Sequence, residues 1–408
     1  MINDQQKIII VGGGLAGQVT ALMLAHHGHA VTLMDAAKQP AQAQTDAEAI
    51  RTTTLNPFAY GLLADLGIIG RMTTLPTPIH CIEVSDERLR PRPGFAIEDR
   101  LLGWDNADEP LAHTARNRDL VAAARAEVAA SPLISILTGS PITAWQPRHP
   151  ELGHAAGMLT DAAGQRFDCQ LVVACDGGAS PLRGMAGIRT ISRNPRQTAL
   201  VADIRLTRPH QHMAWQRFLE SGPLALMPLD DPYLAALVWS LDHETADRLS
   251  DISDDRFDAA LNDAAVSPFG DLTVASRRLA WPLRLNHALT PAARRLTLVG
   301  DAAHAIHPLA GQGFNLAVGD AAALAEALNW GRDHGAEPGA ASVTDRYASK
   351  RRAEVAAMTL ATDGLNLLFG KGPPQLRAAA AMAMSVLDRS PLKRIAQRVA
   401  GGGFSLRG

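Results

Sequence analysis

The residues best suited to chemistry stand in Leu296–Asp320, where an acidic turn and a glycine-rich loop lie close together in the chain. The segment opens with a short apolar run, brief enough to form a buried strand. Gly300-Asp301 follows directly, and a loop rich in glycine precedes Asn315. A carboxylate and backbone N–H groups at such turns can surround a polar cofactor. An ordinary strand-to-helix crossover would show the same local pattern, so the meaning of this segment depends on the rest of the chain.

A second set of glycines stands near the N-terminus, at Gly12, Gly14 and Gly17. The apolar run Lys7–Val11 before them is typical of a strand buried on both faces of a parallel sheet. A helical pattern and a second strand follow, ending at Asp35. This order is the dinucleotide-binding fingerprint, in which the glycines admit a pyrophosphate and the acid binds ribose hydroxyls. The unit predicts a bound nucleotide but does not distinguish NAD from FAD.

A third acidic turn follows the apolar run Leu171–Ala174. Asp176 stands just past that run, with glycines, Ser180 and Arg183 after it. The pattern fits a ligand-binding turn and, equally well, an ordinary turn leading into a capped helix.

Two arginines are further candidates, with different local readings. Arg51 has the pattern of a solvated surface charge. Arg118 stands at the start of the helical pattern Leu120–Ala130, where a cation opposes the helix dipole, so we expect it to have another partner.

The sequence gives little support for a metal site or for a hydrolase. His304 and His307 lie three residues apart with no third ligand nearby, so we predict no metal site. The chain contains no GxSxG motif, no HExxH motif and no clustered pair of carboxylates that would indicate a hydrolase.

Composition indicates an ordinary globular protein of 408 residues, 47% of them apolar and 20% charged. The formal charge of −2 provides no reason to expect nucleic acid as a partner.

Three cysteines without CxxC spacing favour a reducing compartment, and the polar N-terminus does not resemble a signal peptide. No apolar run reaches the roughly 18 residues of a membrane span. We therefore expect a cytoplasmic protein. Peripheral contact with the inner face of a membrane is compatible with this expectation.

The elements that must position these residues are strands and helices in alternation, followed by a strand-rich region. Ala225–Pro228 and Ala235–Ser240 are expected to pair, and Val274–Leu285 to form one further strand. Trp239 and Trp281 are expected in the core rather than at a ligand. The helical runs expected after residue 340 are 343–361 and 374–387, with an apolar patch and a break between them. Residues 389–403 form either a weak interfacial helix or a cap on the core.

The order and spacing of the three turns resemble the flavin-dependent aromatic hydroxylases built like para-hydroxybenzoate hydroxylase. Within that group, Gly300-Asp301-Ala302-Ala303-His304 and His307-Pro308-Leu309-Ala310-Gly311-Gln312-Gly313-Phe314-Asn315-Leu316 are similar to the signature of the ubiquinone-biosynthesis hydroxylase family. Met227-Pro228-Leu229, Leu237-Val238-Trp239-Ser240 and Gly364-Leu365-Asn366 agree with it, so the resemblance covers nearly the whole chain. One departure is Val318-Gly319, because relatives often carry an arginine just before the aspartate that matches Asp320.

The resemblance implies an α/β fold: a Rossmann-like FAD-binding domain, an inserted mixed-sheet substrate domain and C-terminal helices. We expect the FAD-binding domain in residues 1–75, 101–183 and 286–330, the substrate domain in 76–100 and 184–285, and a C-terminal helical region in 331–408.

Each cofactor-site residue acquires a role from this resemblance. Gly12, Gly14 and Gly17 would hold the FAD pyrophosphate, and Asp35 the adenosine ribose. Asp176 would belong to a motif that serves FAD and NAD(P)H together. The other implied FAD contacts are Arg51, Arg118, Gly300 and Asp301, with Asp301 on the ribityl chain.

The loop Pro308–Asn315 would lie along the isoalloxazine ring, its N–H groups facing the electron-rich edge. His307 would orient a substrate, help to deprotonate a phenol, or make a structural hydrogen bond. The residues assigned to catalysis are His307, Pro308, Gly311, Gln312 and Gly313, and Gly313 and Asn315 are also assigned to cofactor binding.

The implied activity is an FAD-dependent monooxygenase that hydroxylates a prenylated phenol in ubiquinone biosynthesis through a flavin 4a-hydroperoxide, with O2 and NAD(P)H or another electron donor as co-substrates. Alternatives are a hydroxylase of another small aromatic compound, a flavoprotein dehydrogenase or reductase, and a non-catalytic flavin-binding subunit. A homodimer and association with other quinone-biosynthesis enzymes are compatible with the resemblance.

Overall fold

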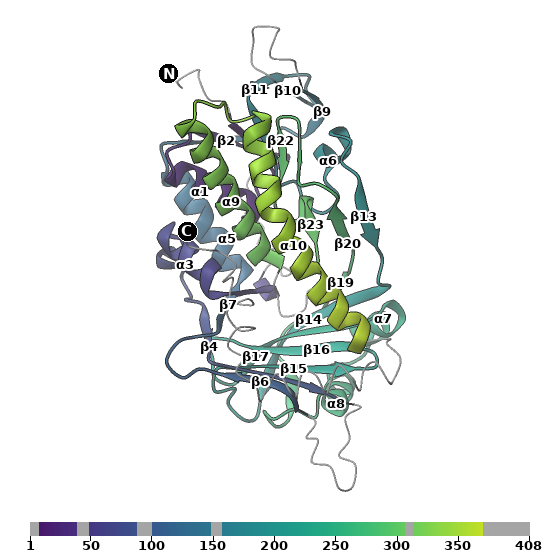
Figure 1. The fold of residues 1–408 in the computed structure, drawn as a ribbon. Coiled ribbons are helices and arrows are strands. Elements are labelled where there is room, and N and C mark those ends of the chain that lie inside the picture. The colour runs from purple at the N-terminus through teal and green to yellow at the C-terminus, as the bar shows by residue number, and fades with distance from the viewer. Residues whose placement is uncertain (1–7, 39–48, 88–99, 148–156, 307–312, 370–408) are drawn as a thin grey trace.

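The computed structural model describes residues 8–38, 49–87, 100–147, 157–306 and 313–369 (Figure 1). One part of the molecule holds a largely parallel sheet covered by helices. The other part is a broad sheet with two helices beside it. The long helix α10 (Ala341–Phe369) runs from the first part toward the second.

A six-stranded sheet forms the centre of the first part, in the order β21-β22-β12-β1-β2-β8. Its five strands from β22 to β8 are parallel, and β21 is an antiparallel edge. The carboxyl ends of parallel strands meet at one edge of a sheet, so the turns after β1, β2, β12 and β22 gather there. The strands are β1 (Ile8–Val11), β2 (Val31–Asp35), β8 (Ile134–Thr138), β12 (Leu171–Ala174), β21 (Ala292–Ala293) and β22 (Leu296–Leu298).

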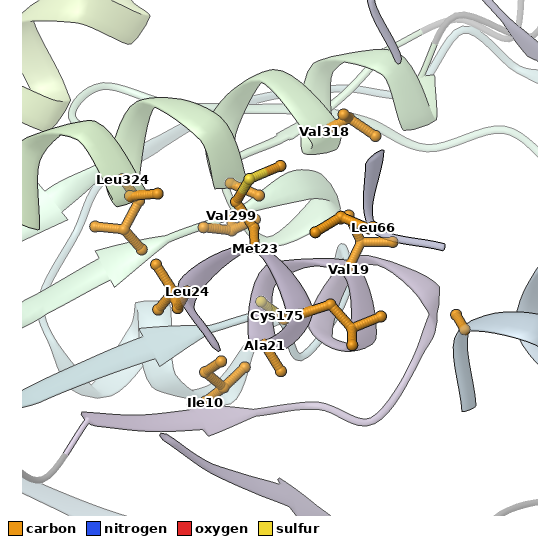
Figure 2. Packing of buried hydrophobic residues seen from close by; sticks show 14 of the residues in the cluster. Ile10, Val19, Ala21, Met23, Leu24, Leu66, Cys175, Val299, Val318 and Leu324 are labelled. Atoms are coloured by element: carbon orange, nitrogen blue, oxygen red, sulfur yellow. The ribbon is translucent and has the colours of Figure 1, made fainter. Parts of the chain in front are cut away.

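Helices α1 (Leu15–His26), α5 (Asn117–Ala130) and α9 (Gly313–Asp333) pack beside this sheet. Every residue of α1 from Gly17 to Leu24 is buried, which explains its nearly uniform apolar sequence. Figure 2 shows Met23 and Leu24 of α1 directed toward Val299 and Leu324. In this core α1 and α9 pack against each other and against Val299, the residue before Gly300.

The second part is an eight-stranded mixed sheet in the order β18-β14-β17-β16-β15-β5-β6, with β19 also paired to β14. Strand β15 is parallel to β5, and the other pairs are antiparallel. Helices α7 (His243–Asp251) and α8 (Asp254–Ala265) supply part of its core. The strands are β5 (Cys81–Asp86), β6 (Arg100–Asp105), β14 (Gln197–Leu206), β15 (Met213–Leu219), β16 (Gly222–Pro228), β17 (Leu234–Asp242), β18 (Leu272–Val274) and β19 (Leu279–Pro282).

Two expectations for this region have opposite outcomes. The predicted pairing of Ala225–Pro228 with Ala235–Ser240 is confirmed, with Leu226 opposite Leu237. The single strand predicted over Val274–Leu285 is wrong, because the chain forms β18, β19 and then β20 in another sheet. Pro282, which has no N–H to donate to a ladder, is the last residue of β19.

Three small sheets complete the described fold. In the first, β3 (Thr52–Leu55) pairs with β7 (Ala112–Arg116), which pairs with β4 (Thr77–Ile79). The second is β13-β20-β23 and the third β11-β10-β9. The remaining elements are α3 (Pro57–Asp65), α4 (Ile68–Arg71), α6 (Pro181–Met185), β9 (Ile142–Pro147), β10 (Gly157–Asp161), β11 (Arg166–Cys169), β13 (Thr190–Arg193), β20 (Leu285–Ala288), β23 (His304–Ala305) and a 3-10 turn (Gly300–Ala302).

Helix α10 is longer than expected, because it continues through Leu365–Phe369, where an apolar patch outside a helix was predicted. The predicted helix 374–387 and the segment 389–403 lie outside the described residues. The division into domains stays a prediction. Strand β5 comes from the segment 76–100, and its partner β6 runs from the last residue of that segment into 101–183.

Candidate functional site

The loop after β1 owes its glycines to two different causes. Gly12 has φ +112°, and a Cβ on it would lie 2.3 Å from the Cys175 carbonyl oxygen. A Cβ on Gly17 would lie 1.9 Å from the Gly12 carbonyl oxygen. These two glycines are therefore required by contacts within the protein. A Cβ on Gly14, the residue before α1, would meet no atom within 4 Å, so the space beside it is open for a ligand at the helix N-terminus.

Asp35, the last residue of β2, lies against the same loop. A Cβ on Gly13 would lie 2.1 Å from Asp35 Oδ2. The other carboxylate oxygen, Oδ1, accepts a hydrogen bond of 3.0 Å from the N–H of Ala37. The glycine at position 13 thus lets the acid approach the loop, a role that the GxGxxG spacing did not assign to it. The run of three glycines at 12–14 was the only signal for it.

Asp176 occupies the turn after β12. Its Oδ2 accepts a hydrogen bond of 3.1 Å from the N–H of Leu182, while its buried Oδ1 has no hydrogen-bond partner among the described residues. Burial raises the pKa of this carboxyl, against the lowering effect of nearby hydrogen bonds and Arg183. A buried acceptor without a partner is costly, which favours a ligand donor at this point.

Arg183 ties this turn to the next one. Its guanidinium donates to the Ala302 carbonyl at 2.7 Å and to the Gly178 carbonyl at 2.8 Å. Ser180 caps the short helix α6 by accepting from the Arg183 N–H at 3.0 Å. The turns after β12 and β22 are therefore held together by one side chain.

The turn after β22 presents Asp301. Gly300 has φ +62°, a left-handed conformation that glycine adopts without strain, and its N–H donates to Asp320 Oδ2 at 2.8 Å. The Asp301 side chain is exposed, yet desolvation by the surrounding protein raises its pKa, while His304 and Arg51 act to lower it. An exposed acid with protein around it, at the carboxyl edge of the sheet, can accept hydrogen bonds from ligand hydroxyls.

Arg51 lies close enough to Asp301 to affect its ionisation and contacts the second part of the molecule. Its guanidinium carbon is 4.7 Å from the ring centroid of Trp281. Trp281 is 49% exposed, so the expectation that it belongs to the core is wrong, whereas Trp239 is buried as expected. Among the described strands, β19, which carries Trp281, pairs with β14 alone. The Trp281 ring packs on a charged side chain instead of in a core.

Arg118 lies in the first turn of α5. Its Nε donates to Asp119 Oδ1 at 3.0 Å, which supplies the partner expected for a cation at this end of a helix. Among the described residues, no hydrogen bond or ion pair joins Arg118 to the turns described above.

The side-chain amide of Asn315 is hydrogen-bonded within the protein. Its Nδ2 donates to the Thr54 carbonyl at 2.9 Å, and its Oδ1 accepts from the Asn56 N–H at 3.1 Å. The amide therefore fastens α9 to β3, the strand that follows Arg51. A Cβ on Gly313, the first described residue of α9, would meet no described atom within 4 Å. His307, Pro308, Gly311 and Gln312 lie outside the described residues.

His304 is buried and forms a 2.7 Å contact with Asp320. Within the described ranges, no group of three or more His, Cys, Asp or Glu side chains could hold a metal ion. Sequence reasoning also missed Arg351, whose Nε donates to Asp320 Oδ1 at 2.6 Å. Those two residues are 31 positions apart, and no local pattern connects them.

These residues fit FAD. The open space at Gly14 suits a pyrophosphate at a helix N-terminus, and Asp35 and Asp301 offer acceptors for the hydroxyls of the two sugar-like parts. The unpartnered oxygen of Asp176 lies in the turn between them in sheet order. A cofactor held along this edge would extend from β2 to β22.

Comparison with known proteins agrees. The family model described as an FAD binding domain matches residues 5–362. The chain is 30% identical to 3-demethoxyubiquinol 3-hydroxylase of Escherichia coli, covering 98% of this chain and 100% of that protein. It is 30% identical to the ubiquinone hydroxylase UbiL of Rhodospirillum rubrum, over 98% of this chain and 90% of that protein.

Solved structures show the same fold. The p-nitrophenol 4-monooxygenase PnpA of Pseudomonas putida superposes with a TM-score of 0.70 at 18% identity, covering 98% of each chain. HpxO of Klebsiella pneumoniae, solved with FAD and uric acid, gives 0.69 at 17% identity, covering 97% of this chain and 95% of that one.

Fold, site and comparisons define the chain as an FAD-dependent monooxygenase with the para-hydroxybenzoate-hydroxylase type of fold, and the predicted α/β class is confirmed. More narrowly, it belongs to the FAD-binding-domain family and, within that family, to the ubiquinone-biosynthesis flavin hydroxylases. Among the described helices, none is long and apolar enough to cross a membrane.

Proposed function

We propose that this enzyme hydroxylates the aromatic ring of a prenylated phenol during ubiquinone biosynthesis. The observation that carries the proposal is the match to E. coli 3-demethoxyubiquinol 3-hydroxylase along 98% of this chain and the whole of that protein. The match therefore takes in both the FAD-binding edge and the eight-stranded sheet. A relative that shared only the nucleotide fingerprint would support FAD binding but not a substrate class.

The protein's part in this reaction is to bind and orient. When bound, FAD supplies the redox chemistry that activates O2. We propose that the first glycine loop holds the pyrophosphate, that Asp35 and Asp301 accept from the ribose and ribityl hydroxyls, and that Asp176 serves the cofactor and the reductant. The further proposed contacts are Arg51, Arg118, Gly300, Gly313 and Asn315, and the proposed ring-facing loop contains His307, Pro308, Gly311 and Gln312.

The structure supports some of these assignments by accessibility. Asp301 and Arg51 are both exposed, and Arg51 is close enough to act on the pKa of Asp301. Asn315 is instead hydrogen-bonded to Thr54 and Asn56, so its proposed effect on the site is indirect. Arg51 also contacts Trp281 of the eight-stranded sheet. A proposed cofactor contact and the proposed substrate-binding part of the molecule therefore meet at this pair.

Partners and location follow from the substrate proposed. NAD(P)H or another donor would bind transiently, because only one nucleotide fingerprint is present. A prenylated substrate resides in a membrane, so we propose a cytoplasmic enzyme in peripheral contact with the inner face of the membrane, as a homodimer or beside other quinone-biosynthesis enzymes.

The first prediction concerns the activity itself. Deleting the gene should cause one prenylated ubiquinone precursor to accumulate, identifiable by mass spectrometry, and the purified holoenzyme should add one oxygen atom from 18O2 to that compound. A Gly14→Val variant should neither prevent this accumulation when it is expressed in the deletion strain nor hydroxylate the compound when it is purified. If the reduced holoenzyme turned O2 into hydrogen peroxide with no hydroxylated product from any prenylated phenol, the reductase alternative would replace this proposal.

A further inference from the structure

A buried charged cluster lies directly behind the turn that presents Asp301. Asp320 of α9 is 1% exposed, and His304 and Arg351 are each 3% exposed. The two oxygens of Asp320 are both engaged. Oδ2 accepts from the Gly300 N–H at 2.8 Å and lies 2.7 Å from His304 Nε2, and Oδ1 accepts from Arg351 Nε at 2.6 Å.

The cluster favours the ionised form of Asp320. Burial by itself would raise the pKa of this carboxyl, but electrostatic interactions with His304 and Arg351 and the hydrogen bonds from His304 and Gly300 together lower it below the ordinary value. A buried carboxylate is tolerated only with such partners. The acceptor of the Gly300 N–H is therefore an anion, which makes this hydrogen bond stronger than one to a neutral acceptor.

Helix α10 supplies the counter-charge through Arg351. The guanidinium also donates to the Leu316 carbonyl at 3.2 Å and pairs with Glu354. A Cβ on Gly319 would lie 3.0 Å from Arg351 Nη1, so α9 has no side chain where the guanidinium sits. The missing side chain at Gly319 of α9 thus leaves room for the guanidinium of Arg351 on α10.

A second contact joins α10 to the same segment. Tyr347, one turn before Arg351, is fully buried, and its hydroxyl donates to the Leu298 carbonyl at 2.6 Å. Leu298 is the last residue of β22, two positions before Gly300. The strand and turn that present Asp301 are therefore held from behind by α10 at two points.

We propose that Asp320 and Arg351 are positioning residues of the FAD site. Arg351 holds the Asp320 carboxylate in place, and that carboxylate holds the Gly300 N–H, so that Asp301 keeps the orientation in which it can accept from the cofactor. Docking of α10 and binding of FAD are then coupled. Because such coupling is reciprocal, FAD must stabilise the docked α10 by the same factor by which docking strengthens FAD binding.

The test is a double-mutant cycle on FAD affinity, measured by flavin fluorescence during titration of FAD into the full-length, FAD-free protein. Asp320→Asn and Arg351→Met should each weaken binding by roughly tenfold, the effect of losing a hydrogen bond to a charged group. Asn keeps an acceptor but removes the charge. Because both residues act through one ion pair, the double variant should be little weaker than either single variant. Additive losses, or unchanged affinity in both single variants, would overturn the proposal.

Two further variants keep the test decisive where a buried charge change harms folding. Arg351→Lys retains the charge and should bind FAD within about threefold of the wild type. Gly319→Ala improves the helix propensity of α9 but crowds the guanidinium, so FAD should bind more weakly although the FAD-free protein unfolds at no lower temperature. Equal effects of Arg351→Lys and Arg351→Met, or full affinity in Gly319→Ala, would contradict the mechanism.

The matched control is Arg346→Met. Arg346 stands on the same helix, but its guanidinium carbon lies 5.1 Å from the centroid of the Trp330 ring. This variant should bind FAD as the wild type does. Hydrogen exchange supplies a readout that overall stability would not move: FAD should slow exchange in α10 of the wild type and of Arg346→Met but not of Arg351→Met. Slowing of equal size in all three would show that α10 and FAD are not coupled through this pair. None of these measurements uses the aromatic substrate, so they stand or fall separately from the proposed hydroxylation.

Discussion

The space around each glycine of the first loop separates the glycines required by contacts within the protein from the one that we propose for the ligand. At Gly12, Gly13 and Gly17 a methyl group would collide with Cys175, Asp35 or the loop itself at 1.9 to 2.3 Å. At Gly14 it would meet nothing within 4 Å. The four residues look alike in the sequence, yet of these four only Gly14 has open space beside it that a pyrophosphate could approach.

Replacing Gly14 and Gly17 by alanine should therefore separate cofactor binding from folding. Gly14→Ala should cost at most about 1 kcal/mol of stability, the cost of a poorer N-cap, while FAD binds at least roughly tenfold more weakly. Gly17→Ala should cost about 3 kcal/mol or more even without FAD, because the methyl group overlaps a carbonyl oxygen. Thermal unfolding of the FAD-free proteins and flavin titration measure the two effects. Equal loss of stability in both variants would contradict this division.

At the scale of elements, the small sheet β3-β7-β4 begins directly after Arg51 and packs against helices α3 and α9. Its strand β3 begins at Thr52, directly after Arg51, and the buried amide of Asn315 binds the carbonyl of Thr54. On β7, the ring of His113 stacks on Tyr60 of α3 at 3.8 Å, which ties the sheet to a helix. Burial, and to a lesser extent the electrostatic interaction with His80, lowers the pKa of His113 to about 4.

His113 should make this region sensitive to acid. Its pKa in the folded protein lies below the unfolded value of 6.5, so its contribution to stability is fully present above pH 6.5 and is lost as the pH falls toward 4. His113→Phe keeps an aromatic ring against Tyr60 but cannot be protonated. The free energy of unfolding of this variant should decline less steeply than that of the wild type between pH 6.5 and 4, as measured by urea unfolding at a series of pH values. Identical slopes would count against a neutral, buried His113.

At the scale of the whole molecule, the proposed site needs a fixed relation between the two large sheets, because the proposed cofactor contacts come from one and Trp281 from the other. Arg116, at the junction of β7 and α5, reaches across to Asp203 of β14 through two hydrogen bonds of 3.2 and 3.0 Å. Both side chains are about 15% exposed or less. The same guanidinium donates to the Ala49 carbonyl, two residues before Arg51, at 3.2 Å. One arginine thus links the two parts next to the site.

Breaking this link should destabilise the protein. Asp203→Asn leaves the Arg116 charge without its bidentate partner and should lower the free energy of unfolding by about 2 kcal/mol in urea. The matched control is Asp231→Asn, whose partner Arg205 is 52% exposed and which acts within the second sheet alone. Exposed ion pairs contribute little, so this control should have a much smaller effect. Equal effects of the two substitutions would show that the Arg116 link carries no special weight.

Much of the fold and of the cofactor edge was predictable from the sequence, because the signals are local. An apolar run followed at once by Gly12, by Asp35, by Asp176 or by Gly300-Asp301 indicates a buried strand with a special turn at its end. The rule that parallel strands bring their carboxyl ends to one edge then places these four turns together. Neither step requires knowledge of which side chains touch.

The contacts that orient those turns were decided only by the tertiary structure. Arg351 meets Asp320, Arg183 meets Ala302, and Trp281 turns outward to Arg51, each across a distance in the chain that no periodic pattern spans. For the same reason the strand expected over Val274–Leu285 divides between two sheets. Its residues can satisfy the alternation of a strand in either partner, and long-range packing selects which one they join.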